Sequence, residues 1–152
     1  MIELKNFTQL DAQEIKLVYE WRNHEKISQF MKNKNFSFQE HLDFINKLKN
    51  DLSKKYFLVS QNSDFIGVID FINITLKTCE FGLYSNPNLK GMGQILMNEI
   101  KKYAFEILKV KNLKACVFKE NERALNLYLK NDFTITKKDE NMFYVELSRG
   151  GG

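Results

Sequence analysis

The spacing of apolar residues along the chain changes repeatedly between a helical period and the alternating period of strands. Such changes of period separate helices from strands. They predict strands at residues 2–7, 56–60, 65–74, 78–85, 113–118, 133–136 and 142–147. They predict helices at residues 11–23, 37–50, 91–108 and 121–130. Asp11 is the expected N-cap of the first helix, and Ser37 with Glu40 forms a capping-box pattern at the start of the second.

The order of predicted elements, β-α-α-β-β-β-α-β-α-β-β, is typical of a mixed α+β domain. The polar cluster at residues 61–64 predicts a hairpin between two of the strands. The strand-helix-strand segment from 78 to 118 predicts a parallel pair with a right-handed crossover, whereas the other pairs are expected to be antiparallel. We therefore expect one domain over residues 1–147, with helices flanking a central, mostly antiparallel sheet. Residues 148–152 form a tail to which we assign no role.

The composition excludes several classes of protein. A hydrophobic share of 43% over 152 residues is too high for a disordered chain and sufficient for a buried core. No apolar run approaches the roughly 20 residues of a membrane-spanning helix, and residues 1–10 do not resemble a signal peptide. Two cysteines, Cys79 and Cys116, provide neither a disulfide framework nor a metal-ligand cluster. We therefore expect a cytoplasmic protein with no bound metal and no membrane partner.

The net charge of +4 comes mostly from lysine, because Arg22, Arg123 and Arg149 are the only arginines. This balance suits a small anionic ligand. A nucleic-acid partner is not expected, since the arginines are not clustered and no basic segment is interleaved with aromatic residues.

The segment from 80 to 100 is the most informative, because Gly91 and Gly93 lie where a strand gives way to a long helix. Glycines at this point let backbone N–H groups face a ligand, and the positive end of the helix favours phosphate. Lys90 adds a cation, so a pyrophosphate is the expected ligand, although such glycines also occur as ordinary loop residues. A Walker loop is excluded because its Gly-Lys-Ser/Thr ending is absent, and a Rossmann loop because Leu96 replaces the third glycine.

This segment resembles the GNAT family of acetyl-CoA-dependent N-acyltransferases. The family signature, Gln/Arg-x-x-Gly-x-Gly/Ala, corresponds to Asn88-Leu89-Lys90-Gly91-Met92-Gly93, in which asparagine replaces the leading residue. A second family element corresponds to Asn121-x-x-Ala124-x-x-x-Tyr128. The resemblance implies the GNAT fold, a splayed parallel strand pair, and acetyl-CoA as co-substrate. The cofactor contacts that it implies are Phe81, Gly82, Leu83, Leu89, Lys90, Gly91, Met92, Gly93, Gln94, Asn121, Ala124 and Lys130, with Lys119 as the alternative to Lys130 at the 3′-phosphate.

Three side chains are candidates for the chemistry. The resemblance implies that Tyr128 protonates the departing thiolate, while a backbone N–H of residues 81–83 polarises the thioester carbonyl. The alternative for Tyr128 is an ordinary core aromatic. Asp70 lies among aliphatic residues on a strand face, which should raise its pKa and suit it to act as general base, directly or through water. Glu80 on the next strand is the competing base, and either carboxylate could instead pair with a lysine.

Further segments resemble the bacterial N-acetyltransferases of pseudaminic acid biosynthesis. They are Trp21-Arg22-Asn23-His24, His41–Ile45, Lys55–Leu58, Gly67–Phe71 and Lys101–Glu106. The resemblance implies that the acceptor is the 4-amino group of UDP-4-amino-4,6-dideoxy-N-acetyl-β-L-altrosamine, and that the product is used to glycosylate flagellin. The substrate-binding residues expected are Arg22 for the diphosphate, His41 for the nucleotide, and Asn73 and Tyr84 for the sugar.

Two other functions share these features. A protein N-terminal or ribosomal-protein acetyltransferase would have a similar first helix and the same cofactor loop. A non-catalytic acyl-CoA-binding module would have the loop without needing Tyr128. Exposed edge strands near the C-terminus would permit a homodimer.

Overall fold

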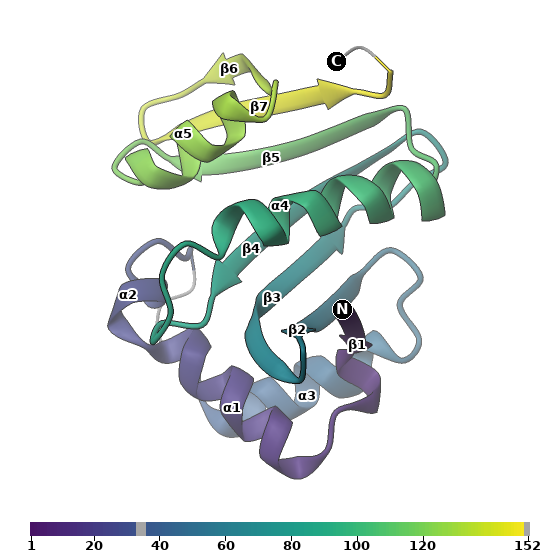
Figure 1. The fold of residues 1–152 in the computed structure, drawn as a ribbon, viewed down its shortest axis with the longest axis vertical. Coiled ribbons are helices and arrows are strands. Elements are labelled where there is room, and N and C mark those ends of the chain that lie inside the picture. Colours follow the sequence, from purple (N-terminus) through teal and green to yellow (C-terminus); the bar gives the residue numbers. More distant parts are fainter. Residues whose placement is uncertain (33–35, 151–152) are drawn as a thin grey trace.

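The computed structural model describes residues 1–32 and 36–150, and it shows a seven-stranded sheet with helices on both faces (Figure 1). The strands are β1 (Ile2–Asn6), β2 (Lys55–Gln61), β3 (Asp64–Ile72), β4 (Thr78–Ser85), β5 (Asn112–Phe118), β6 (Thr134–Lys138) and β7 (Met142–Ser148). The helices are α1 (Ala12–Asn23), α2 (Glu25–Ser28), α3 (Phe38–Leu48), α4 (Gly93–Lys102) and α5 (Glu122–Lys130). A 3-10 turn, η1 (Phe7–Gln9), follows β1, and a π turn, η2 (Tyr103–Ile107), follows α4. Of the tail 148–152, residues 151–152 lie outside the described residues.

The sheet has the strand order β1-β2-β3-β4-β5-β7-β6, and within the described residues only β4 and β5 pair in parallel. That pairing begins with Thr78 opposite Asn112 and ends with Glu80 opposite Lys114. Both strands continue beyond it, β4 to Ser85 and β5 to Phe118. The two strands therefore separate beyond Glu80. The predicted sheet, mostly antiparallel with one splayed parallel pair, is confirmed, and the splay opens one backbone edge of β4 to a ligand.

Two hydrophobic clusters hold the helices against opposite faces of the sheet. On one face α4, η2 and α5 pack against strand residues such as Ile69, and on the other α1, α2 and α3 pack against strand residues such as Val68. Because successive side chains of a strand point to opposite faces, these two neighbours in β3 belong to different clusters. Asp70 shares the face of Val68, whereas Tyr128 belongs to the cluster beneath α5.

The predicted caps fix where α1 and α3 begin. Asp11 accepts a hydrogen bond from the N–H of Glu14 at 2.8 Å, and Ser37 accepts one from the N–H of Glu40 at 3.1 Å. Each glutamate bonds back to the N–H of its capping residue, which completes a capping box. A cap of this kind stabilises a helix by about 1 kcal/mol. The predicted starts of both helices are therefore confirmed.

Two helical segments differ from the sequence prediction. The four-residue helix α2 is too short to have an apolar repeat, and it begins where His24 Nδ1 accepts a hydrogen bond from the N–H of Lys26 at 3.1 Å. The predicted helix 91–108 changes to a π turn after Lys102. Ile107, which the apolar pattern assigns to the buried stripe, is 62% exposed. A π turn adds one residue to the turn, which rotates Ile107 away from the sheet.

Candidate active site

The start of α4 is the candidate cofactor cradle. Gly91 has a φ of 76°, a left-handed conformation that suits glycine, and it turns the chain into the helix. Met92 occupies the N-cap position without a side-chain cap hydrogen bond, whereas Asp11, Ser37 and Asn121 cap α1, α3 and α5. The first N–H groups of a helix have no acceptor within it. This uncapped end therefore fits the pyrophosphate of acetyl-CoA.

The predicted cofactor side chains around this cradle have different surroundings. Leu89 and Lys90 are exposed in the loop before α4. Gln94 and Asn121, in contrast, bond within the protein, Gln94 to the side chain of Asn131 and Asn121 to the backbone at the start of α5. The groups in the first turn of α4 that remain open to a ligand are consequently its backbone N–H groups.

A buried amide network joins α4 to the end of α5. Asn131, 6% exposed, donates to Gln94 Oε1 at 2.9 Å and to the carbonyl of Leu127 at 2.8 Å. Its Oδ1 accepts from Gln94 Nε2 at 2.9 Å and from Lys101 Nζ at 3.2 Å. The network fixes α5, which carries Tyr128, relative to the cradle.

Tyr128 lies at the point where β4 and β5 separate. Its ring packs edge-on against Phe81, with centroids 5.2 Å apart, and it is 5% exposed. Burial raises the pKa of the phenol, and the nearby Asp70 and Cys116 raise it further. Asp70 and Cys116 lie on the sheet face opposite α5. Their charges therefore act on the pKa of Tyr128 through the gap between the strands. The phenol therefore remains protonated at neutral pH, as a proton donor must.

Asp70 lies against β4 beside the same gap. It pairs in register with Gly82, where an added Cβ would lie only 2.6 Å from Asp70 Oδ2. Glycine at position 82 thus leaves the room that the carboxylate occupies. Burial, and after it the charge of Glu80, raises the pKa of Asp70 to about 7. This agrees with the raised pKa that the sequence predicts, and a carboxylate with such a pKa can accept a proton near neutrality.

Replacement of Gly82 by Ala is expected to displace the carboxylate and lower kcat by about 10- to 100-fold, because small misplacements of reacting groups are costly. Steady-state kinetics of the Gly82→Ala, Asp70→Asn and doubly substituted proteins test this expectation. The double variant should be no slower than Asp70→Asn alone, since both changes act through one carboxylate. Independent, additive losses would contradict it.

Glu80, the competing base, is held by Asn73. Asn73 Nδ2 donates to Glu80 Oε1 at 3.2 Å, from a residue whose φ is 50°. The amide that the sequence assigns to sugar binding therefore has an intramolecular partner. By orienting Glu80, Asn73 also influences the charge that Asp70 experiences.

Arg22 and two tyrosines lie on the α1/α3 side of Asp70. Burial raises the pKa of Tyr56 and of Tyr84, Asp70 raises both further, and the charge of Arg22 lowers both. Burial in turn lowers the pKa of Arg22. Tyr56 pairs in register with Asp70, and Tyr84 pairs with Val68 two positions before it, so the two tyrosines lie beside Asp70 on one face. We call these three residues, with Arg22, the acceptor cluster. A cation, two hydroxyls and a carboxylate suit an anionic ligand that carries an amine.

His41 lies between α1 and α3, and the charge of Arg22 reaches it. It is 3% exposed, with Nε2 3.2 Å from the carbonyl oxygen of Ile15 and its ring 5.6 Å from that of Tyr19. Burial lowers its pKa, so the imidazole is neutral. In the structure His41 helps to pack α1 against α3, and its contact with the nucleotide stays a prediction.

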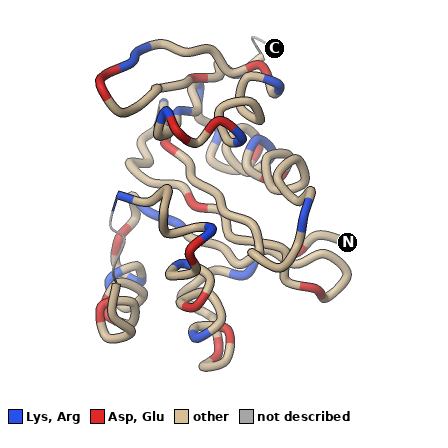
Figure 2. Tube along the Cα trace, turned by 90° about the vertical axis from the view of Figure 1, so that its left-hand side faces the viewer, with Lys and Arg blue, Asp and Glu red and all other residues tan. Residues whose placement is uncertain are grey.

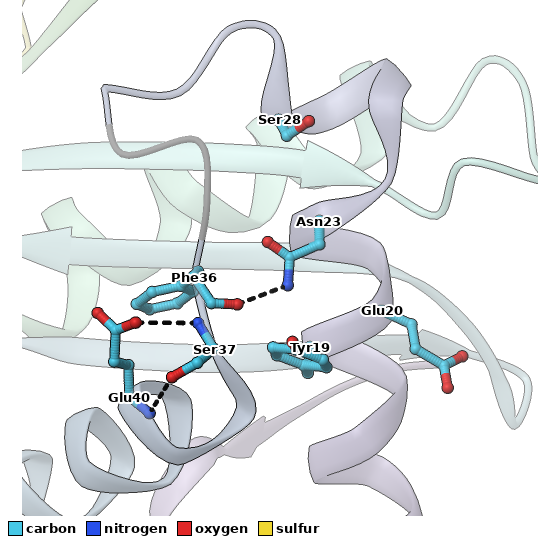
Figure 3. Close-up of a pocket in the computed structure, with 7 residues that line it drawn as sticks. All are labelled: Tyr19, Glu20, Asn23, Ser28, Phe36, Ser37 and Glu40. Atoms are coloured by element: carbon cyan, nitrogen blue, oxygen red, sulfur yellow. Dashed lines mark hydrogen bonds between the residues drawn. The ribbon is translucent and has the colours of Figure 1, made fainter.

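A groove of about 720 Å³ opens between α1 and the start of α3 (Figure 3). It is lined by Tyr19, Glu20, Asn23, Ser28, Phe36, Ser37 and Glu40. Phe36 also lies under the Arg22 guanidinium, 5.3 Å from ring centroid to Cζ, so the groove adjoins the acceptor cluster. The catalytic candidates Asp70, Glu80 and Tyr128 are not among its lining residues.

Tyr56, Cys116 and Lys32 are site residues that the sequence pattern does not single out. Tyr56 pairs in register with Asp70. Burial raises the pKa of the Cys116 thiol, while the neighbouring Lys32 ammonium lowers it, which places Lys32 near β5. Strand alternation could have placed Tyr56 on the Asp70 face, but only the register identifies its partner.

Across residues 1–32 and 36–150, no group of three His, Cys, Asp or Glu side chains is arranged to hold a metal ion. Within the same ranges, no helix has the length and apolar character needed to cross a bilayer.

A family model described as an acetyltransferase (GNAT) domain matches residues 2–134. The match spans most of the chain, which therefore belongs to the GNAT acetyltransferase family. The family predicted from the glycine motif and the Asn121–Tyr128 element is confirmed. So is the class of enzyme, an acetyl-CoA-dependent N-acetyltransferase.

Within this family the chain is similar to the acetyltransferase PseH of Campylobacter jejuni, with 63% identity over 149 residues, 98% of this chain and 95% of PseH. The crystal structure of C. jejuni N-acetyltransferase PseH in complex with acetyl coenzyme A has a TM-score of 0.87 at 58% identity, covering 98% of this chain and 99% of that one. A Vibrio cholerae spermidine N-acetyltransferase, crystallised with CoA and spermine, also has a TM-score of 0.87, over 98% of this chain and 96% of that one. Its identity is 21%, so it shares the fold alone.

Proposed function

We propose that this protein transfers the acetyl group of acetyl-CoA to the 4-amino group of UDP-4-amino-4,6-dideoxy-N-acetyl-β-L-altrosamine, in pseudaminic acid biosynthesis for flagellin glycosylation. The observation that carries the proposal is that Asp70, in register with Gly82, and Tyr128, packed on Phe81, flank the part of β4 that is no longer paired with β5. The 63% identity to PseH supports the same acceptor.

The residues around the gap fit acetyl-CoA, which supplies the acetyl group as a thioester when bound. The N–H groups in the first turn of α4, from Gly93 onward, would hold its pyrophosphate. The open edge of β4 at Phe81–Leu83 would pair with the pantetheine arm and polarise the thioester carbonyl. Lys130, exposed at the end of α5, or Lys119, beside the ring of Phe143, would meet the 3′-phosphate.

Two side chains would accept and donate the protons that move during acetyl transfer. Asp70, with a pKa of about 7, takes the proton that the acceptor nitrogen loses as the C–N bond forms. Tyr128, kept protonated by burial, gives a proton to the sulfur as the C–S bond breaks. Because one lies on the α1/α3 face and the other on the α5 face, they approach the reacting carbon from opposite sides of the sheet.

The acceptor cluster would orient the nucleotide sugar. The planar guanidinium of Arg22 suits the diphosphate, and Tyr84 offers a hydroxyl to the sugar. Phe36 lies under that guanidinium, and together with Tyr19 it gives the adjoining groove two aromatic faces for a base.

Two further expectations belong to this proposal. A cytoplasmic location agrees with two cysteines that are both free thiols. A homodimer would use the edge strand β6, whose five residues, Thr134–Lys138, are all exposed.

The purified protein, supplied with acetyl-CoA, should release CoA thiol rapidly with the UDP-4-amino sugar, and mass spectrometry should show one acetyl group on the product. Peptides with free N-termini and spermidine are the competing acceptors, and UDP-N-acetylglucosamine, which has no free amine, is the blank. Acetylation of peptide or spermidine without the amino sugar would overturn the acceptor but leave the acetyltransferase class. Binding of acetyl-CoA without turnover of any acceptor would favour a non-catalytic binding module.

A further inference from the structure

Four loops lie side by side at the end of the sheet where β4 and β5 are paired. Backbone hydrogen bonds connect them in sequence: Ile74 N–H to Ser53 O at 3.1 Å, Lys111 N–H to Lys77 O at 2.7 Å, and Arg149 N–H to Lys111 O at 2.8 Å. We call the surface made by residues 49–55, 73–78, 107–112 and 148–149 the basic end. It occupies the right-hand side of Figure 1, away from the start of α4.

The basic end exposes large apolar side chains at its loop tips. Leu52 is 91% exposed, Leu76 is 94% exposed and Ile107 is 62% exposed. Of the exposed large hydrophobic residues in the described chain, these three have the highest exposure apart from Met1. Leu52 and Leu76 come from two different loops and Ile107 from the end of η2, so they form separate points and not one helix face.

The same surface concentrates positive charge. Its four segments contain seven lysines and arginines and one aspartate, a net charge of +6 in a chain whose total is +4. The remainder of the chain is therefore slightly acidic. Figure 2, which views the molecule from the opposite end, shows acidic and basic residues interspersed along the elements.

A hollow of about 370 Å³ lies within the basic end and extends to β1 and η1. Lys49, Lys54 and Lys55 line it together with Leu52, and so do Asp51 and Tyr56. Lysine ammonium groups beside an exposed leucine provide charge for a phosphate headgroup and an apolar contact for the chain beneath it.

We infer that the basic end binds peripherally to a membrane surface rich in anionic phospholipids, with Leu52 and Leu76 entering the interface. Protein–protein interfaces favour aromatic residues and arginine and are depleted of lysine. The four segments contain no aromatic residue and only one arginine, Arg149, so their chemistry fits a lipid surface better than a protein partner. The sequence predicts no membrane partner because no segment can span a bilayer, but peripheral binding needs no such segment.

Binding at this end would leave catalysis unobstructed. The cradle at Gly91 and the separated parts of β4 and β5 lie at the other end of the sheet (Figure 1). Variants at Leu52, Leu76, Lys77, Lys109 and Lys111, which are not candidate site residues, should therefore keep their turnover of a soluble acceptor. This inference does not depend on which amine the enzyme acetylates.

Sedimentation with phosphatidylcholine vesicles, with and without phosphatidylserine, tests the inference on the full chain. We expect binding only with phosphatidylserine, and a steep loss of binding as salt is raised. Replacement of Lys77, Lys109 and Lys111 by Ala should weaken binding by about 100-fold, since each lysine contributes about fivefold. Replacement of Leu52 and Leu76 by Ser should weaken it further. Lys138→Ala on β6 is the matched control and should bind as wild type.

Circular dichroism and turnover of each variant show whether it is folded. Equal binding to neutral and anionic vesicles would overturn the inference, as would undiminished binding of the folded triple lysine variant. Retention on immobilised polyglutamate without binding to anionic vesicles would overturn it in favour of an acidic protein partner.

Discussion

Replacement of Tyr128 by Phe is expected to lower kcat by about 10²- to 10⁴-fold while leaving the KM for acetyl-CoA nearly unchanged. The substitution removes only the hydroxyl, so the packing of the ring against Phe81 and Phe133 is retained. In the proposed mechanism this hydroxyl donates its proton as the thiolate leaves, after the cofactor is already bound. Steady-state kinetics of thiol release, with titration of acetyl-CoA by calorimetry, measures both quantities.

Tyr103→Phe is the matched control for this experiment. Tyr103 also packs in the cluster beneath α4, with its ring centroid 5.0 Å from that of Phe57, but it lies in η2 and away from the gap. It should retain wild-type turnover. If Tyr128→Phe turned over acceptor as fast as Tyr103→Phe, Tyr128 would be only the core aromatic that its burial also allows.

The elements of the fold follow from short-range patterns in the sequence. Capping boxes at Asp11 and Ser37 depend on residues three positions apart, and the changes of apolar period locate the seven strands. The π turn at Tyr103–Ile107 could not be predicted, because an apolar stripe with a period near 3.6 does not distinguish it from a continuing α-helix.

The position of the glycine loop could also be predicted, because Gly91 and Gly93 are adjacent to the helix that begins there. The acceptor side could be predicted only in part. Arg22 and Tyr84 belong to it, but Tyr56 joins them through strand register, which a single strand does not reveal. The burial of His41 could not be predicted, since an isolated polar residue on a helix does not show whether another helix covers it.

The closeness of Asp70 to Gly82 is the part of the site most dependent on tertiary structure. The aliphatic neighbours of Asp70 predict a raised pKa, and the structure agrees. That Gly82 provides the space for the carboxylate follows only from the pairing of β3 with β4.

Asp70→Asn is expected to lower kcat/KM by about 10²- to 10⁴-fold at pH 8, because an amide cannot accept the proton of the acceptor nitrogen. In the wild-type enzyme Asp70 is protonated below its pKa of about 7, so kcat/KM should fall as the pH decreases through that value. The variant should lose this dependence. A pH series of initial rates at subsaturating acceptor measures both effects.

The acceptor amine also titrates, and Glu80→Gln separates its contribution from that of Asp70. The negative charge of Glu80 raises the pKa of Asp70, so its removal should shift the pH profile toward lower pH without abolishing activity. The pKa of the free acceptor does not depend on the enzyme and would not move. If Glu80→Gln abolished turnover and Asp70→Asn only shifted the profile, the roles of the two carboxylates would be exchanged.

Stability should change in the opposite direction to activity in the Asp70→Asn protein. The pKa of Asp70 is about 7 in the folded chain, against 3.8 for an ordinary aspartate, so above pH 7 folding requires a half-buried carboxylate to be charged. The neutral Asp70 carboxyl makes its full contribution to the free energy of unfolding below about pH 4. This contribution is lost as the pH rises through 7. At pH 8 the asparagine variant should therefore be more stable by at most about 4 kcal/mol, with little difference at pH 4. Urea unfolding at the two pH values measures this difference. If Asp70 is held in an unfavourable environment for catalysis, the Asp70→Asn protein should be slower but more stable. If the variant is destabilised at pH 8, Asp70 has a structural role.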